Sequence, residues 1–309
     1  AKYEHANDWG NRRWNTPGVI RDGELVTTDL IKINLGIEEF IEHSFYEPWS
    51  GHPHPTDPMG DPLSPYHPWN KETRPKPEGT NWTEKYSWST APRWDRTAVE
   101  TGTFIRMWNT VLAGKLPHRR FLDIRNRSLF ITIPKHERPE MVAEWKIPEV
   151  WNAFERNLSR AYAIGYNAVV AYDNWLIGMD LLKKGETRTS TPFEVPNNHR
   201  MGVGFWGAGR GWLTHHIELD KGAIVNYQII TPSTLMASPR DPWGGAGPYE
   251  EAVLGTPILE EFDKPEDFRG IDVLRTIRSF DPCMPCTTHM YAGDQVVTQD
   301  VNTCACGVE

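Results

Sequence analysis

The stretch from residue 148 to residue 184 is the feature that most constrains the fold of this chain. Its apolar and aromatic side chains recur at the three- and four-residue spacing of one helical face. Pro148 suits a first helical turn, and Lys183-Lys184-Gly185 suits a last turn with its cap. These signals predict one long helix in a bundle, with an apolar face that is core and has no chemical role. That face comprises Trp151, Phe154, Leu158, Tyr162, Tyr166, Val169, Trp175, Met179 and Leu182.

Shorter elements are predicted on both sides of this helix. Residues 97–114 suit a helix that ends near Gly114, and residues 129–134 suit a strand that a proline stops. Two apolar runs flank Asp220-Lys221-Gly222, which is a strong hairpin signal. The sequence therefore predicts paired strands near residues 212–219 and 223–230.

Residues 48–95 are rich in proline, tryptophan and histidine. The prolines preclude long helices and central strands, whereas the tryptophans would be costly to leave in water. We therefore expect an ordered excursion that wraps the surface or a partner subunit. His52-Pro53-His54 offers two imidazoles to a metal, but the alternating prolines hold the segment extended, so we interpret these histidines as solvated loop residues.

The composition favours a thiol-retaining cytosolic protein. The chain has 33 basic and 41 acidic residues, and its net charge of −8 argues against a nucleic-acid or anionic-membrane partner. No apolar run approaches the length of a transmembrane helix, and no signal peptide opens the sequence. All four cysteines follow position 282, which makes a disulfide-stapled secreted fold a poor explanation. A length of 309 residues suits one large domain, and no linker divides it.

The richest motif lies near the C-terminus, where Cys283 and Cys286 are followed by His289 in the string Asp-Pro-Cys-Met-Pro-Cys-Thr-Thr-His. A turn can bring both thiolates to one soft metal ion, and the flanking prolines reduce the entropy lost when that turn is ordered. A pair of cysteines at this spacing also occurs in redox sites and zinc knuckles. The pair alone leaves these three readings open.

The whole string is more specific, because it resembles the C-terminal nickel-ligand motif of nickel-iron hydrogenase large subunits, DPCxxCxxH followed by a removable extension. Further stretches match the family pattern at 208–211, 231–234, 237–241, 247–252, 255–257, 268–272 and 275–280. Residues 7–14 and the Pro/Trp-rich excursion look most like the actinobacterial-type, high-affinity uptake branch.

The resemblance implies a bimetallic site. Cys283 would be a terminal nickel thiolate and Cys286 would bridge nickel to an iron that carries one carbon monoxide and two cyanides. Arg210 would hold its guanidinium above the open bridging position. His289 would bind a magnesium or iron ion near the mature C-terminus. The iron pocket would be walled by Ala208, Gly209, Thr231 and Pro232, with Ser233 hydrogen-bonded to a cyanide.

The implied function is that of an uptake hydrogenase catalytic subunit, which cleaves H2 heterolytically and passes electrons to the iron–sulfur clusters of a small subunit. Since no cluster motif occurs in this sequence, the chemistry requires that partner. The implied fold is helix-rich α+β, with a long-helix bundle and small sheets or hairpins. The implied location is cytoplasmic, with any membrane association made through partners.

Maturation is implied by the residues beyond the motif. In the family a dedicated endopeptidase cuts after the final histidine once insertion factors have delivered nickel. Here the bond would be His289–Met290, and residues 290–309 would be the removable extension. The extension carries Cys304 and Cys306, which could hold a metal in transit, although incidental thiols are the simpler interpretation.

Two departures from the family pattern stand out. Four thiolates hold nickel in the family, and the N-terminal pair is absent from this sequence. We expect an N-terminal portion outside this sequence to supply it, rather than another chain. Leu235 and Met236 also stand where relatives usually carry Trp-Asn, and Thr287 and Thr288 replace small residues, which changes the packing beside the metals.

Three other functions can be weighed against this one. A structural zinc site would use Cys283, Cys286, Cys304 and Cys306, but it leaves the stretches around Arg210 and Pro232 unexplained. A thiol-disulfide oxidoreductase usually needs its cysteine pair at the start of a helix, and Pro285 with the following Thr287-Thr288 gives poor support for one here. The related subunit of respiratory complex I lacks the nickel thiolates, so their presence argues against it.

Overall fold

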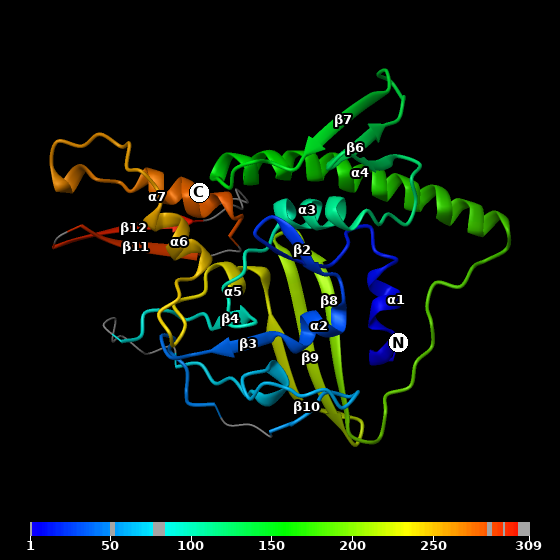
Figure 1. Ribbon diagram of the computed structural model, residues 1–309, viewed down its shortest axis with the longest axis horizontal. Coiled ribbons are helices and arrows are strands. Elements are labelled where there is room, and N and C mark those ends of the chain that lie inside the picture. Colours follow the sequence, from blue (N-terminus) through cyan, green and yellow to red (C-terminus); the bar gives the residue numbers. More distant parts are fainter. Residues whose placement is uncertain (1, 50–52, 77–83, 283–285, 293, 302–309) are drawn as a thin grey trace.

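The computed structural model describes residues 2–49, 53–76, 84–282, 286–292 and 294–301, and on 286–292 and much of 294–301 it describes the backbone only. Helices and groups of strands follow one another along the chain (Figure 1). The α-helices of the described residues are α1 (Ala6–Gly10), α2 (Leu30–Leu35), α3 (Thr103–Ala113), α4 (Ala153–Lys183), α5 (Pro232–Met236), α6 (Pro248–Leu254) and α7 (Ile271–Ser279). Single 3-10 turns are η1 (Tyr3–His5), η2 (Pro68–Asn70) and η3 (Pro265–Asp267).

The strands of the described residues form two three-stranded sheets, the two hairpins β1–β2 and β11–β12, and a two-stranded sheet of β3 and β4, all antiparallel. One sheet has the order β5–β6–β7 and the other the order β10–β9–β8. The strands are β1 (Val19–Arg21), β2 (Glu24–Thr27), β3 (Ile37–Phe40), β4 (Ala91–Trp94), β5 (Leu122–Arg125), β6 (Ser128–Ile133), β7 (Met141–Lys146), β8 (Arg200–Ala208), β9 (Gly211–Asp220), β10 (Ala223–Ile230), β11 (Cys286–Ala292) and β12 (Gln295–Val301). The predicted α+β class with small sheets is confirmed.

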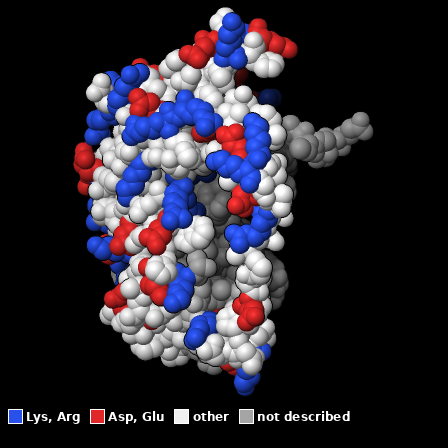
Figure 2. Space-filling view, turned by 90° about the vertical axis from the view of Figure 1, so that its right-hand side faces the viewer, with Lys and Arg blue, Asp and Glu red and all other residues white. Residues whose placement is uncertain are grey.

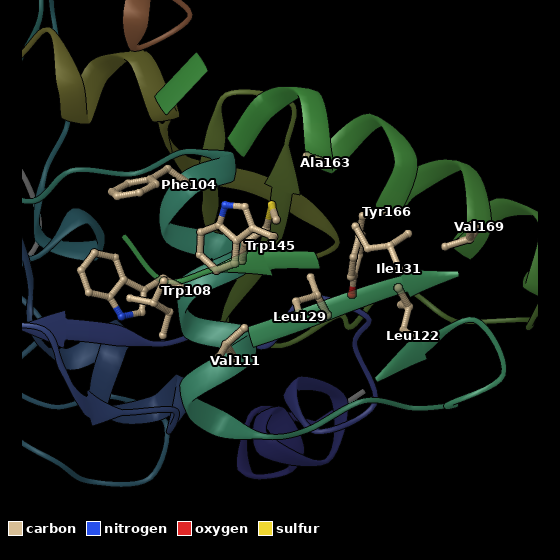
Figure 3. Close-up of a cluster of buried hydrophobic side chains, with 12 residues drawn as sticks. Phe104, Trp108, Val111, Leu122, Leu129, Ile131, Trp145, Ala163, Tyr166 and Val169 are labelled. Carbon is tan, nitrogen blue, oxygen red and sulfur yellow. The ribbon is translucent and has the colours of Figure 1, made fainter. Parts of the chain in front are cut away.

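The main hydrophobic core lies between α3, α4 and β6 (Figure 3). Trp145 is 2% exposed and donates its indole N–H to the Ser159 hydroxyl at 3.0 Å, so its one polar atom is satisfied. Tyr166 is equally buried and donates to the Trp14 carbonyl. Burying each such aromatic side chain stabilises the fold by roughly 1.5–3 kcal/mol. This core fixes α4 over the rest of the chain.

Helix α4 confirms the predicted long helix but begins later than expected. The Asn152 side chain accepts from the Glu155 N–H at 2.9 Å and so caps the first turn at Ala153. Pro148 lies before this cap, outside the helix. At the other end Gly185 has a φ of +81°, as a C-terminal cap requires. The predicted end is therefore correct.

The prediction that the whole apolar face of α4 is core is wrong. Tyr166 and Val169 are buried, but Phe154 is 70% exposed and Trp175 is 57% exposed. The physical reason is that α3, α7 and the β5–β6–β7 sheet cover only part of this 31-residue helix, which extends beyond them in Figure 1. Trp151, Leu158, Met179 and Leu182 are exposed as well.

The described part of the Pro/Trp-rich excursion packs against the β10–β9–β8 sheet. Its turn η2 contacts both β9 and β10. Trp69 is 1% exposed and donates its indole N–H to the Gly202 carbonyl at 3.2 Å. His67 is fully buried and pairs with the Asn34 carbonyl at 3.1 Å. These contacts explain why a proline-rich segment is ordered without long elements of its own.

Candidate metal centre

One end of the β10–β9–β8 sheet gathers the residues predicted to wall the iron pocket. Strand β8 ends at Ala208 and β9 begins at Gly211, so Gly209 and Arg210 form the turn between them. Strand β10 ends at Ile230, which pairs with Thr214 near the start of β9. Because both outer strands end beside the start of β9, residues 208–210 and 231–233 lie at the same edge of the sheet.

Glycine is required at the first residue of β9. Gly211 has a φ of +130°, a conformation that other residues rarely adopt. A Cβ atom there would lie 2.2 Å from the Thr101 hydroxyl and 2.5 Å from the Gly102 amide nitrogen. The Trp212 N–H donates to the same Thr101 hydroxyl at 2.6 Å. The turn that carries Arg210 is therefore held closely against residues 101–102.

Arg210 faces the entrance of the cysteine motif. Its Nε lies 4.0 Å from a carboxylate oxygen of Asp281, two residues before Cys283. That Nε is buried and has no hydrogen-bond partner among the residues that the structure describes. A buried N–H without a hydrogen-bond partner costs about 1–3 kcal/mol, so such an atom requires an explanation, of which a ligand or a bound water is one.

Arg210 and Asp281 line a small cavity, which two further arginines from α4 also line. Arg156 makes two hydrogen bonds with the Glu100 carboxylate, at 2.6 and 2.8 Å, and its guanidinium lies 3.9 Å from the centre of the Phe280 ring. Arg160 donates to the Ser279 carbonyl. Burial lowers the pKa of Arg160, and the positive charges of Arg156 and Arg210 lower it further against the raising effect of Asp281. The cavity is therefore locally cationic in a chain of net negative charge.

Helix α3 also holds the backbone of the turn formed by Gly209 and Arg210. Arg106 of α3 donates to the Gly209 carbonyl at 3.4 Å, and burial lowers its pKa. A Cβ at Gly207 would meet the Arg106 guanidinium at 2.9 Å. The absence of a side chain at Gly207 thus leaves room for the Arg106 guanidinium.

Helix α5 presents the second predicted segment. Thr231 is its N-cap and accepts from the Thr234 N–H at 3.2 Å, while Pro232 occupies the first helical turn and is buried. Ser233 lies on the same short helix. Leu235 and Met236, which stand where relatives were expected to carry Trp-Asn, are buried, at 7% and 0% exposed.

Of the four cysteines, only Cys286 lies within the described residues. Cys283 lies outside the described residues. Cys286 and His289 lie on β11, where the backbone alone is described, and the predicted scissile bond at Met290 is on the same strand. Strand β11 pairs with β12, so that His289 faces Thr298. The predicted roles of these residues stay predictions, and Cys304 and Cys306 also lie outside the described residues.

Sequence reasoning missed the arginines that surround Arg210. Arg156 and Arg160 are four residues apart, so a helix places both on one face, and this like-charged pair is the signal that could have found them. Asp281 was visible in the motif, but its partner lies about 70 residues earlier in the chain. Glu100 carries no sequence signal that would connect it with Arg156.

Comparisons with known proteins identify the class. A family model described as nickel-dependent hydrogenase matches residues 2–289, and this chain belongs to that family. The chain is 31% identical, over 94% of its length, to the uptake hydrogenase large subunit of Rhizobium leguminosarum bv. viciae, of which it covers 47%. It is also 31% identical to the hydrogenase-1 large chain of Escherichia coli, with 46% of that chain covered.

A solved structure supports the same conclusion. The actinobacterial-type NiFe-hydrogenase from Ralstonia eutropha H16 superimposes with a TM-score of 0.86 and 42% sequence identity. The alignment covers 92% of this chain and 52% of that one. The chain thus spans about half the length of the relatives it matches. The structural zinc alternative is not supported, because the match extends over nearly the whole chain.

The described residues fit the surroundings of a nickel-iron centre. Arg210 offers an unpartnered buried donor beside the motif that carries the thiols. Gly209 leaves open space, since nothing lies within 4 Å of a Cβ built on it. The arginines supply positive charge suited to a metal group with anionic ligands.

Proposed function

We propose that this chain is the C-terminal, catalytic portion of an uptake hydrogenase large subunit that oxidises H2. The observation that carries the proposal is the approach of Arg210 to Asp281 at the start of the cysteine motif, with the Arg210 Nε left without a hydrogen-bond partner among the described residues. The family match and the resemblance to uptake hydrogenases support it.

The nickel-iron centre, when bound, supplies an electron-poor metal pair with a vacant position at which H2 is polarised. Cys283 and Cys286 would hold the metals as thiolates, and a polypeptide segment outside this chain would supply the other two. Cys283 would act as the base that accepts the proton, since a terminal thiolate keeps a free lone pair. The Arg210 guanidinium carries N–H donors and no acceptor, so it would donate hydrogen bonds without competing for that proton.

The neighbouring residues would complete the centre. Ala208, Gly209, Thr231 and Pro232 would wall an iron that carries carbon monoxide and two cyanides, and the Ser233 hydroxyl would donate to one cyanide. His289 would bind magnesium or iron. A maturation endopeptidase would then cut the His289–Met290 bond after nickel-insertion factors have acted.

An iron–sulfur small subunit is proposed as the electron-accepting partner. The exposed apolar side chains of α4, such as Phe154 and Ile164 at 70% and 73%, support burial of this helix against further polypeptide. Two candidates for this covering polypeptide are the segment that relatives possess beyond this match and the small subunit.

Among the described residues no helix is both long and apolar enough to cross a membrane. On the face in Figure 2, basic side chains gather in the upper half with acidic side chains between them.

The proposal is tested on the full-length enzyme purified with its partner subunits from its own host. Infrared spectroscopy should show intrinsic carbon monoxide and cyanide bands. Arg210→Lys should keep these bands and the nickel content but lower H2 oxidation by about 10²–10³-fold, as expected when one preorganised donor is lost. Arg74→Lys, at an exposed arginine paired with Glu72, is the matched control and should keep full activity.

Two results would contradict the proposal. Unchanged turnover in Arg210→Lys would remove that residue from the mechanism. Cys286→Ala should lose both metals, so intact H2 oxidation in that variant would refute the bridging role.

A further inference from the structure

A second cluster of metal-ligand side chains lies at the far end of β9 from Arg210. Within the described part of the chain, His54, His199 and Glu218 are the one group of three whose ligand atoms all lie within 4.8 Å of one another. They come from the excursion, from the residue before β8, and from the end of β9. The nickel-iron proposal uses none of these residues.

Both histidines point the same ring nitrogen at one carboxylate. His54 Nε2 lies 3.1 Å from one oxygen of Glu218, and His199 Nε2 lies 2.7 Å from the other. The two imidazole rings stack, with centres 5.7 Å apart and planes inclined by 27°. The expectation that His54 is a solvated loop residue is therefore wrong, because its side chain is only 17% exposed. His52 lies outside the described residues.

The group is positioned by the fold. Alternation along β9 places Glu218 on the same buried face as Thr214 and His216, and its side chain is 6% exposed. The buried Asn70 side chain makes two hydrogen bonds with the backbone of His54. It accepts from the His54 N–H and donates to the His54 carbonyl at 3.1 Å. Such support limits the rearrangement that ligand binding would require.

The cluster has the charge pattern of a cation site. Glu218 is a buried carboxylate at which two imidazoles are directed. A divalent cation bound between the three side chains would neutralise the carboxylate, and each imidazole would bind it through a ring nitrogen.

We infer that His54, His199 and Glu218 form a binding site for a divalent first-row transition ion, with Zn²⁺ as the best-fitting ion. Two imidazoles and one carboxylate are a donor set that zinc uses with water in the fourth position. Zinc–ligand bonds of about 2.0–2.1 Å place neighbouring ligand atoms roughly 3.3 Å apart in a tetrahedron. His54 Nε2 lies 3.1 Å from one Glu218 oxygen, close to this value, and all three ligand atoms lie within 4.8 Å of one another. His199, whose Nε2 contacts the other oxygen and whose side chain is 49% exposed, is the ligand that would adjust.

The consequence is structural. A bound ion would join three segments, of which His54 and Glu218 are 164 residues apart. It would clamp the Pro/Trp-rich excursion onto the β10–β9–β8 sheet and thereby add its binding free energy to that of folding.

The test uses the full-length large subunit in its complex, with Zn²⁺ alone as the probe. Equilibrium dialysis followed by mass-spectrometric metal analysis should find one zinc per large subunit that His199→Ala and Glu218→Gln each weaken at least tenfold. His215→Ala is the matched control, because this neighbouring histidine of β9 pairs with Tyr227 instead, and it should bind zinc as the parent does. Zinc-edge X-ray absorption should show nitrogen and oxygen ligands without sulfur.

Since Glu218 is buried and its variant can fail to fold, His199→Ala at a half-exposed position keeps the test decisive. Equal zinc binding by the parent and His199→Ala would overturn the inference. So would a zinc–sulfur distance near 2.3 Å, which would assign the ion to cysteines. Zinc should also raise the thermal unfolding midpoint of the parent and not that of His199→Ala.

Discussion

The buried ion pair between Arg93 and Asp241 should be the most sensitive point of the scaffold that holds α5. The Arg93 side chain is 0% exposed, and its Nε donates to Asp241 at 3.1 Å. Its remaining donors reach the Ser238 hydroxyl and three backbone carbonyls, those of Pro92, Pro239 and Gly245, at 2.9–3.0 Å. One side chain of β4 thus fixes the loop that follows α5, and with it the predicted iron-pocket wall.

Arg93→Met keeps the apolar stem but removes every one of these donors. The Asp241 carboxylate would keep the N–H groups of Trp243 and Gly245 at 3.0 and 2.8 Å while losing its counter-charge. Removing one partner of a buried ion pair typically costs 3–5 kcal/mol, because the other charge stays buried. The thermal midpoint should fall as well, by less than the roughly 6–20 °C that 2–4 °C for each kcal/mol would give in a chain of 150–250 residues.

The assay is thermal unfolding of the full-length large subunit, followed by circular dichroism. Adding Asp241→Asn to Arg93→Met removes the stranded charge but keeps an oxygen for the two N–H groups, so it should recover at least about 1 kcal/mol of the loss. Arg74→Met, at an exposed pair, should change stability by less than about 0.5 kcal/mol. A loss below about 1 kcal/mol in Arg93→Met, or no recovery in the double variant, would refute the reasoning.

Two further predictions concern the sheet. Gly211→Ala should destabilise the protein by about 2–4 kcal/mol, because residue 211 has a φ of +130° and a Cβ there would collide with Thr101. Gly209→Ala, where a Cβ would meet open space, should be nearly neutral in the same unfolding assay. Burial lowers the pKa of His216 well below its ordinary value of 6.5, so the unfolded chain binds the proton more readily and stability should be lost as pH falls below 6.5. His216→Gln should flatten this acid limb between pH 7 and 5, and an unchanged slope would contradict the assignment.

Local signals predicted the elements well where one residue decides the backbone. The hairpin signal Asp220-Lys221-Gly222 is confirmed, with Lys221 and Gly222 at φ values of +49° and +76° between β9 and β10. The end of α3 at Gly114, with a φ of +64°, is confirmed as well. Such turns depend on the conformational freedom of single residues, which the sequence displays directly.

The burial of α4 and the surroundings of Arg210 could not be predicted in the same way. Helical spacing shows that Phe154 and Trp175 share a face, but not whether a neighbouring segment covers it. The motif resemblance singled out Arg210 and Cys283, whereas the contact between Arg210 and Asp281 depends on how α7 packs against α4. The pairing of His54 with Glu218 is likewise a product of tertiary docking, for which histidine and proline spacing gave the opposite expectation.

The unpartnered Nε of Arg210 leads to a last prediction, in which stability and activity respond in opposite directions. Among the described residues this donor has no hydrogen-bond partner, and its ion pair with Asp281 is long, at 4.0 Å, with the Arg210 side chain 29% exposed. Arg210→Met should therefore leave the unfolding free energy of the metal-free full-length protein unchanged or raise it by up to about 2 kcal/mol, while H2 oxidation by the mature enzyme is lost. Chemical denaturation of metal-free parent and variant measures the first effect. A loss of more than about 1 kcal/mol would show that Arg210 serves the fold rather than the metal centre, because a side chain kept for a ligand should be dispensable when that ligand is absent.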